Sequence, residues 1–302
     1  MKRVLFITAH RLGDAVISLA ALSAMMARYP QAYFTIVCGP AVCDLFRYMP
    51  RCERLIVMEK RPYNQHWLAL WRDVVRYRWE VVVDLRASLV SYGVWSRARY
   101  KVRGGRQKGL KLAQHARALG VQYAHYPTLW LGAQEQAYAA TLLPDEGVWL
   151  ALAITAGTEH KIWPVESFAT FARQMQARGF RPLLVYGPGE REARLAAPVR
   201  ALLPNVLDIG GGQYSLAQVA ALIARCSLFV GGDSGLMHLA AALNVPTLGL
   251  FGPSYASQYA PSGRWAEVLL APGPEGEGDM AALKVENVQH AALALYERAR
   301  AQ

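Results

Sequence analysis

The sequence predicts an α/β protein of two domains, each a doubly wound parallel sheet with helices on both faces. Apolar runs that suit buried strands alternate with amphipathic patterns that suit helices, and this alternation occurs twice along the chain. The 302 residues are about twice the length of a typical domain. Between the two series, Pro144-Asp145-Glu146-Gly147 forms a break. We therefore expect an N-terminal domain over 1–146 and a C-terminal domain over 147–302.

The elements of the first domain follow from short apolar runs and helical periodicity. Three consecutive valines end at Asp84, and such a β-branched run is typical of a strand buried on both faces. Strands are expected over 4–8, 34–38, 55–57 and 81–84, and helices over 14–28, 66–78 and 134–143.

The second domain repeats this alternation. Strands are expected over 149–154, 182–186, 206–209, 228–230 and 247–251, and helices over 165–178, 190–203, 215–224, 236–243 and 285–300. The sequence leaves open whether the final helix returns across the first domain. Because ligands of doubly wound sheets bind beyond the carboxyl ends of the strands, we expect the two sheets to face a central cleft that holds the ligand.

The composition excludes several classes of protein. With 53% hydrophobic residues the chain is neither disordered nor collagen-like, and no apolar run reaches the ~20 residues that span a bilayer. The apolar start is interrupted by His10, Arg11 and Asp14, so a signal peptide is not expected. Four cysteines without a CxxC pair indicate reduced thiols, and no Asp-x-Asp metal pair occurs. We expect a soluble, cytoplasmic protein.

The positive charge is concentrated in the first half. Residues 1–150 hold 21 Lys and Arg against 10 Asp and Glu, whereas the second half is neutral. This asymmetry favours an anionic partner such as a phosphorylated lipid or a membrane surface, and nucleic acid is less favoured because no nucleic-acid module accompanies the charge. The alternative is a solvated basic face. The window without acidic residues contains Arg86, Arg97, Arg99, Lys101, Arg103, Arg106, Lys108, Lys111 and Arg117.

The turn after the first expected strand reads His10-Arg11-Leu12-Gly13-Asp14. Asp14 then lies at the start of a helix, where it either caps the helix or complements its dipole. Alternatively its carboxylate lies at the mouth of the cleft and takes a proton from an attacking hydroxyl. The turn is not a GxGxxG fingerprint, so a nicotinamide site is not expected there.

A second turn, Gly231-Gly232-Asp233-Ser234-Gly235, leads from a strand into a helix. Its unpaired backbone N–H groups suit a phosphate. Asp233 either caps the helix or bonds a sugar hydroxyl. His238, one turn further on, either faces a diphosphate or is a core histidine.

Two further turns carry charged side chains. Lys161, in Lys161-Ile162-Trp163-Pro164, lies beside an expected helix N-terminus, where it either offsets charge on a leaving phosphate or is a surface lysine. Glu190 follows a strand and a glycine turn, and an acid at such a place often receives ribose hydroxyls.

Five segments occur in a characteristic order and spacing: HRLGD at 10–14, KIWP at 161–164, YGPGERE at 186–192, SLAQVAALIARC at 215–226 and GGDSGLMHLAAALNVPTLGLFGPS at 231–254. Together they resemble the ADP-heptose:lipopolysaccharide heptosyltransferase family, glycosyltransferase family nine, which has the GT-B fold. The segment over 231–254 is the most specific of the five.

The resemblance implies a role for each matching residue. Asp14 matches the base that deprotonates the acceptor hydroxyl, and Lys161 matches a lysine beside the donor phosphates. Glu190 matches the acid on the donor ribose, and Tyr214 lies where a backbone group meets the adenine. The diphosphate and sugar element is matched by Asp233, Ser234, Gly235 and His238. Acceptor contacts are expected from His10, Arg11, Arg97, Arg99, Lys101 and Arg103.

The resemblance also implies the reaction. It is an inverting, metal-independent transfer of heptose from ADP-heptose to a lipopolysaccharide inner-core acceptor, an anionic glycolipid, at the cytoplasmic face of the inner membrane. No cofactor or nucleic acid is implied, and we expect a monomer that contacts the membrane peripherally. Two alternatives remain: a related inverting transferase for another nucleotide sugar or acceptor, and a non-catalytic protein that binds nucleotide sugars.

Overall fold

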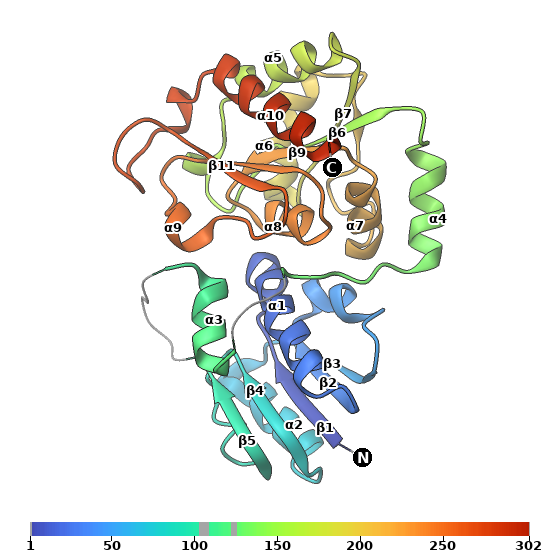
Figure 1. The fold of residues 1–302 in the computed structure, drawn as a ribbon, viewed down its shortest axis with the longest axis vertical. Helices are drawn as coiled ribbons and strands as arrows, with labels where there is room; N and C mark the ends of the chain where they lie inside the picture. Colours follow the sequence, from blue (N-terminus) through green and yellow to red (C-terminus); the bar gives the residue numbers. More distant parts are fainter. Residues whose placement is uncertain (1, 103–108, 122–125, 302) are drawn as a thin grey trace. The chain divides into compact units, whose positions relative to one another are not determined.

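The computed structural model describes residues 2–102, 109–121 and 126–301, and the chain divides into two compact units, Met1–Trp130 and Leu131–Gln302. Each unit is built around one parallel sheet (Figure 1). The division falls before the expected boundary at 146/147. The reason is that helix α4 (Ala133–Leu142) packs on α7 (Leu216–Ala224) and so belongs to the second unit.

The described sheet of the first unit is five-stranded, in the order β3-β2-β1-β4-β5. Neighbouring strands are parallel throughout. The central strand β1 is buried from Val4 to Ile7, as its apolar run predicts. The bounds are Lys2–Ile7 for β1, Ala32–Cys38 for β2, Cys52–Val57 for β3, Trp79–Asp84 for β4 and Ser96–Lys101 for β5.

The helices of the first unit cover both faces of this sheet (Figure 1). Helix α1 packs with α3, whereas α2 contributes Leu70 and Val74 to the core on the other face. The sequence did not predict β5 and α3, which lie in the basic stretch. The bounds are Leu12–Arg28 for α1, Gln65–Val74 for α2 and Lys111–Leu119 for α3, with short 3-10 helices η1 (Pro40–Phe46) and η2 (Pro62–Asn64).

The described sheet of the second unit is six-stranded and parallel, in the order β11-β10-β9-β6-β7-β8. Successive residues of β6 are buried on opposite faces of the sheet, which explains its continuous apolar run. The strands are β6 (Val148–Ala153), β7 (Phe180–Val185), β8 (Leu207–Asp208), β9 (Leu228–Gly232), β10 (Thr247–Phe251) and β11 (Ala266–Leu270).

The five helices expected in the second unit form close to their predicted bounds, whereas α9 was not expected. Helix α6 remains a helix across Pro198. The final helix α10 packs on α5 and on the sheet of its own unit, with Val288, Ala292 and Leu295 in that core. The helix is therefore part of the core of its own unit. The remaining helices are η3 (Glu159–Lys161), α5 (Val165–Gln176), α6 (Glu190–Leu202), α8 (Gly235–Ala242), α9 (Ala256–Tyr259), η4 (Met280–Ala282) and α10 (Val285–Arg300).

Two expectations from the composition concern membrane spans and cysteines. Within 2–102, 109–121 and 126–301, helices are too short or too polar to cross a bilayer. The cysteines Cys38, Cys43, Cys52 and Cys226 are all free thiols, and burial raises the pKa of Cys38 to about 12.

Candidate functional site

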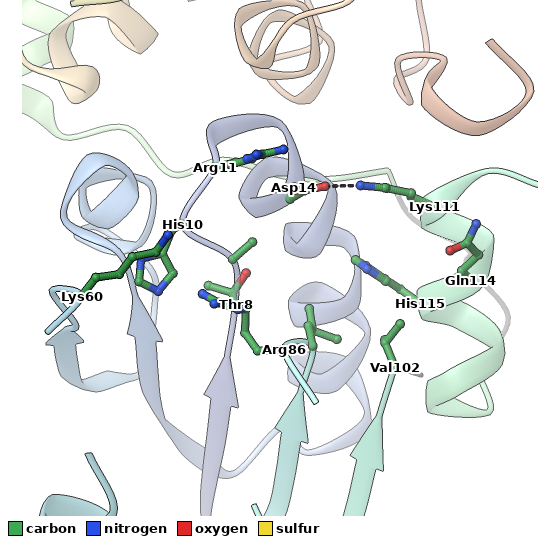
Figure 2. A pocket seen from close by; sticks show the side chains of 12 residues that line it. Thr8, His10, Arg11, Asp14, Lys60, Arg86, Val102, Lys111, Gln114 and His115 are labelled. Atoms are coloured by element: carbon green, nitrogen blue, oxygen red, sulfur yellow. Dashed lines mark hydrogen bonds and ion pairs between the residues drawn. The ribbon is translucent and has the colours of Figure 1, made fainter. Parts of the chain in front are cut away.

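A pocket of about 430 Å³ opens at the carboxyl ends of β1 and β4 in the first unit. Its wall combines the turn before α1, the residues after β4 and one face of α3 (Figure 2). This is the position that a doubly wound sheet predicts for a ligand. The lining residues are Thr8, Ala9, His10, Arg11, Asp14, Lys60, Leu85, Arg86, Val102, Lys111, Gln114 and His115.

Asp14 is paired with a lysine from another helix. Its Oδ1 lies 2.5 Å from Nζ of Lys111, the first residue of α3, and the pair is drawn as a dashed line in Figure 2. The two side chains remain 33% and 29% exposed, respectively. Arg11 occupies the N-cap of α1, so Asp14 is an acid of the first turn and not the cap. Its carboxylate is both oriented by a cation and accessible from the pocket.

His115 lies one turn after Lys111 on the same helix and lines the same pocket (Figure 2). Desolvation lowers the pKa of His115 to about 4, Asp14 opposes this shift and Lys111 adds to it. Its Nδ1 is buried and, among the described residues, has no hydrogen-bond partner. His115 is therefore a neutral imidazole near neutral pH and adds no charge to the pocket.

His10 is held against Gly39. A Cβ atom at Gly39 would lie 2.7 Å from Nδ1 of His10, so a side chain there would displace the ring. Burial, followed by the charges of Arg86 and Lys60, lowers the pKa of His10. The fixed positive charge of the pocket therefore comes from its lysine and arginine side chains, and Asp14 is the carboxylate among the lining residues. These cations are Arg11, Lys60, Arg86 and Lys111.

The expected acceptor residues divide into two groups. His10 and Arg11 line the pocket with Asp14, whereas the residues of the edge strand β5 are not among the described lining residues. Arg97 pairs with Glu80 at 3.7 Å, and Arg99 donates to the carbonyl of Val94 at 2.8 Å. Lys101 donates to the carbonyl of Ser88 at 3.0 Å. Arg103 lies outside the described residues.

The sequence analysis did not assign three of the pocket's cations, Lys60, Arg86 and Lys111, to the site. Arg86 and Lys111 were noted only as part of the basic window. Arg86 follows β4 and Lys60 follows β3, so the position after a parallel strand was a usable signal. Lys111 comes from α3, a helix that the sequence did not predict.

In the second unit Asp233 lies between β9 and α8 and receives two hydrogen bonds. Its Oδ2 accepts from Nζ of Lys161 at 2.8 Å and from Oγ of Ser254 at 2.8 Å. The Asp233 side chain is only 10% exposed. The backbone of the Lys161 turn also touches this turn, since a Cβ atom at Gly232 would lie 2.7 Å from the carbonyl oxygen of Lys161. The structure thus brings together Lys161 and Asp233, which the sequence had singled out separately.

The turn continues into a capped helix. Ser234 is the N-cap of α8, and its Oγ accepts from the backbone N–H of Met237 at 3.4 Å. Gly235 begins the helix, whose first N–H groups carry the positive end of the helix dipole. His238 is buried, with 5% of its surface exposed, which suits a core histidine. Its assignment to the donor remains a prediction.

Glu190 and Tyr214 lie on neighbouring turns. Glu190 begins α6 directly after Gly189, which has φ 101°, and its side chain is exposed. Tyr214 packs on Tyr138, with ring centroids 6.2 Å apart. Nearby, the Tyr186 ring covers Gly210, where a Cβ atom would be 2.2 Å from the ring. Glu190 is thus exposed as the first residue of α6, and Tyr214 is half-buried just before α7.

The model of the family described as glycosyltransferase family 9 (heptosyltransferase) matches residues 96–277, more than half of the chain. The chain belongs to glycosyltransferase family 9. The matched range includes Lys161, Glu190 and Asp233, whereas Asp14 precedes it.

This glycosyltransferase is similar to known proteins and solved structures over most of its length. It is 29% identical to lipopolysaccharide heptosyltransferase 1 of Pseudomonas aeruginosa, over 83% of this chain and 79% of that protein. Its fold matches the glycosyl transferase family 9 structure from Veillonella parvula, with a TM-score of 0.86 at 20% identity and 98% coverage of both chains. The structure of E. coli ADP-heptose lps heptosyltransferase II matches with a TM-score of 0.81 at 23% identity, over 99% of this chain and 100% of that one. The expected GT-B fold class, two parallel-sheet α/β domains, is confirmed.

Proposed function

We propose that this glycosyltransferase moves heptose from ADP-heptose to a hydroxyl of a lipopolysaccharide inner-core acceptor, with inversion and without a metal. The observation that carries the proposal is the Asp14 carboxylate, which faces a basic pocket at the turn where the resemblance expects the base. Family membership supports the reaction type, and the names of the P. aeruginosa and E. coli relatives support donor and acceptor.

The basic pocket accounts for the acceptor half of the reaction. A phosphate or carboxylate of an anionic glycolipid would bind among Arg86, Lys60 and Arg11, since charge-assisted hydrogen bonds to such groups are strong. The same anion would attract Lys111 and loosen its pairing with Asp14. The carboxylate is then available to accept the proton of the attacking hydroxyl.

The second unit accounts for the donor half. The diphosphate would lie at the N-terminus of α8, with Lys161 offsetting charge as ADP leaves. Asp233 keeps the Lys161 ammonium in position. The acceptor oxygen forms a bond to the anomeric carbon while the bond from that carbon to the phosphate oxygen breaks. The hydroxyl proton goes to Asp14, and the electron pair leaves with ADP.

The setting of the reaction is part of the proposal. The protein would act as a monomer in the cytoplasm and meet its acceptor at the inner face of the inner membrane. Lys161 and the helix N-terminus supply the positive charge that a leaving diphosphate needs, so no metal or other cofactor is assigned.

A thermal-shift screen of ADP-, UDP- and GDP-linked sugars tests the donor. ADP-heptose at about 100 times its dissociation constant would stabilise the protein by ~2.7 kcal/mol, with smaller shifts for UDP and GDP sugars. Preferential stabilisation by a UDP or GDP sugar would instead identify a related transferase. Stabilisation by ADP-heptose without transfer or hydrolysis would identify a non-catalytic binding protein.

A further inference from the structure

A second pocket of the first unit is largely apolar and has a volume of about 580 Å³. It lies between α2 and the loop that follows β4. The donor and acceptor chemistry above leaves it unused. We call it the tryptophan groove, and it is lined by Asn64, Trp67, Leu68, Trp71, Arg86, Ala87, Ser88, Leu89 and Val90.

Large apolar side chains stand out from the rim of this groove. Leu89 is 83% exposed, and Tyr63, next to the lining residue Asn64, is 94% exposed. Leu68 and Trp71 on α2 are exposed as well. Single exposed apolar residues are ordinary, but a cluster of them around an apolar groove marks an interaction surface.

The groove is bordered by cations. The Arg86 guanidinium lies over the Trp67 ring, 5.6 Å from its centroid, and Nζ of Lys101 lies 3.3 Å from the ring centroid of the exposed Tyr92. Lys60 and Arg61 are exposed just before Tyr63. Aromatic side chains beside lysine and arginine are typical of surfaces at the level of lipid headgroups, where the rings meet the interface and the cations meet phosphates.

The loop that forms one wall of the groove is fixed in shape. The buried Asp84 accepts hydrogen bonds from the backbone N–H of Arg86 at 2.9 Å and of Ser88 at 2.8 Å. Ala87 between them has φ 51°, a left-handed conformation that costs energy for a residue other than glycine. The loop backbone is therefore already ordered in the conformation that places Arg86 at the Asp14 pocket and Leu89 at the groove.

We propose that the tryptophan groove and its rim bind the surface of an anionic phospholipid bilayer. Leu89 and Tyr63 enter the interfacial layer, and Arg86 and Lys101 meet the phosphates. Arg86 lines both pockets, so this contact places the Asp14 pocket at the level of the headgroups. The purpose of the contact rests on the proposed glycolipid acceptor, whereas the contact itself is measured without donor or acceptor.

Cosedimentation with vesicles tests the proposal. Vesicles of equal parts phosphatidylcholine and phosphatidylglycerol should bind the protein, pure phosphatidylcholine vesicles should bind it less, and added salt should weaken the binding. Leu89→Gln and Tyr63→Asn should each lower the partition coefficient roughly fivefold to tenfold, because each removes part of an apolar side chain from the interface. Asparagine tolerates the left-handed backbone at position 63.

The matched control is Leu270→Gln. It makes the same change at another exposed leucine, 50% exposed, in the second unit and should leave vesicle binding unchanged. Thermal unfolding checks that all variants are folded, and transfer to a deacylated, water-soluble acceptor should be unaffected by Leu89→Gln. Wild-type binding by both groove variants, or no binding by the parent protein, overturns the proposal. Concentration-dependent dimerisation that Leu89→Gln abolishes would also overturn it, because the groove would then bind a second copy of the chain. Loss of transfer to the deacylated acceptor in Leu89→Gln would overturn it as well, because the groove would then belong to the acceptor site. Absence of heptose transfer in a protein that binds vesicles would refute only the proposed function.

Discussion

Each unit places an aspartate–lysine pair at the turn between a strand and a helix, and the two pairs are held differently. In the first unit Asp14 meets Lys111 at 2.5 Å and stays 33% exposed in an open pocket. In the second unit Asp233 meets Lys161 at 2.8 Å, also accepts from Ser254, and is only 10% exposed. Similar chemistry therefore occurs once in an accessible setting and once in an enclosed one.

The difference separates a group that can react from a group that positions another. An exposed ion pair contributes little to stability and can exchange partners at small cost. A carboxylate with two donors and little exposure is expensive to leave unpaired. Under the proposed mechanism, this difference suits Asp14 for proton transfer and Asp233 for holding the Lys161 ammonium in position.

Replacement of Asp14 gives the largest expected effect. Asp14→Asn should lower turnover by roughly 10²–10⁴-fold, the usual contribution of one general base, and leave donor affinity nearly unchanged. Because the pair is only half-buried and borders an open pocket, the free energy of unfolding should change by less than about 1 kcal/mol. Steady-state kinetics and chemical denaturation measure the two effects, with Asp73→Asn, an exposed aspartate on α2, as the control. Normal turnover in Asp14→Asn would remove this carboxylate from the mechanism.

Replacement of Asp233 should show the opposite pattern in stability. Asp233→Asn removes the charge that pairs with Lys161, and we expect the free energy of unfolding to fall by about 2–3 kcal/mol. Denaturant unfolding of this variant beside Asp14→Asn compares the two pairs directly. Equal stability losses in the two variants would contradict the distinction drawn between them.

His115 makes the first unit sensitive to acid. Its folded-state pKa of about 4 lies below the ordinary 6.5, so the unfolded chain binds the proton first as pH falls. Stability should therefore decrease as pH falls from about 6.5 towards 4, by about 1–2 kcal/mol at pH ~5, with no further contribution below about 4. His115→Gln should flatten this part of the profile in thermal unfolding. His290→Gln, at an exposed histidine of α10, serves as the control. If it flattens the pH profile as much as His115→Gln does, burial of His115 is not the cause of the acid sensitivity.

The smallest expected effect sharpens the assignment of the acceptor pocket. Arg86→Gln should raise the acceptor KM by about tenfold, the value of one charge-assisted hydrogen bond, with little change in kcat. Arg97→Gln, on the edge strand and paired with Glu80, should leave the acceptor KM unchanged. Initial rates at varied acceptor concentration separate the two. If Arg97→Gln raises the acceptor KM more than Arg86→Gln does, the acceptor instead binds at β5, as the sequence alone predicted.

Most of the fold could be predicted because most strands are buried on both faces and read as apolar runs. Strand β5 escaped detection because it lies at the sheet edge and carries Arg97, Arg99 and Lys101 on alternate positions, so no apolar run marks it. The compact units divide before the expected boundary for a tertiary reason. The packing of α4 on α7 cannot be read from the break at Pro144.

The candidate site was predictable where a single turn carries it. Asp14, Lys161 and Asp233 each follow a recognisable strand, and the turn chemistry makes them candidates. The pocket around Asp14 was not predictable in the same way, because Lys60, Arg86 and Lys111 come from segments far apart in the sequence. Only the strand order, with β1 beside β4, brings these side chains to one edge of the sheet.

The loop anchored by Asp84 has a consequence for how this protein can change over time. The same short loop borders both the Asp14 pocket and the tryptophan groove. Hydrogen bonds to the buried Asp84 carboxylate fix its shape. Under the two proposals, a substitution that reshapes this loop for a new acceptor also reshapes the surface that would contact lipid. Acceptor preference and membrane affinity should therefore change together when residues of this loop are replaced.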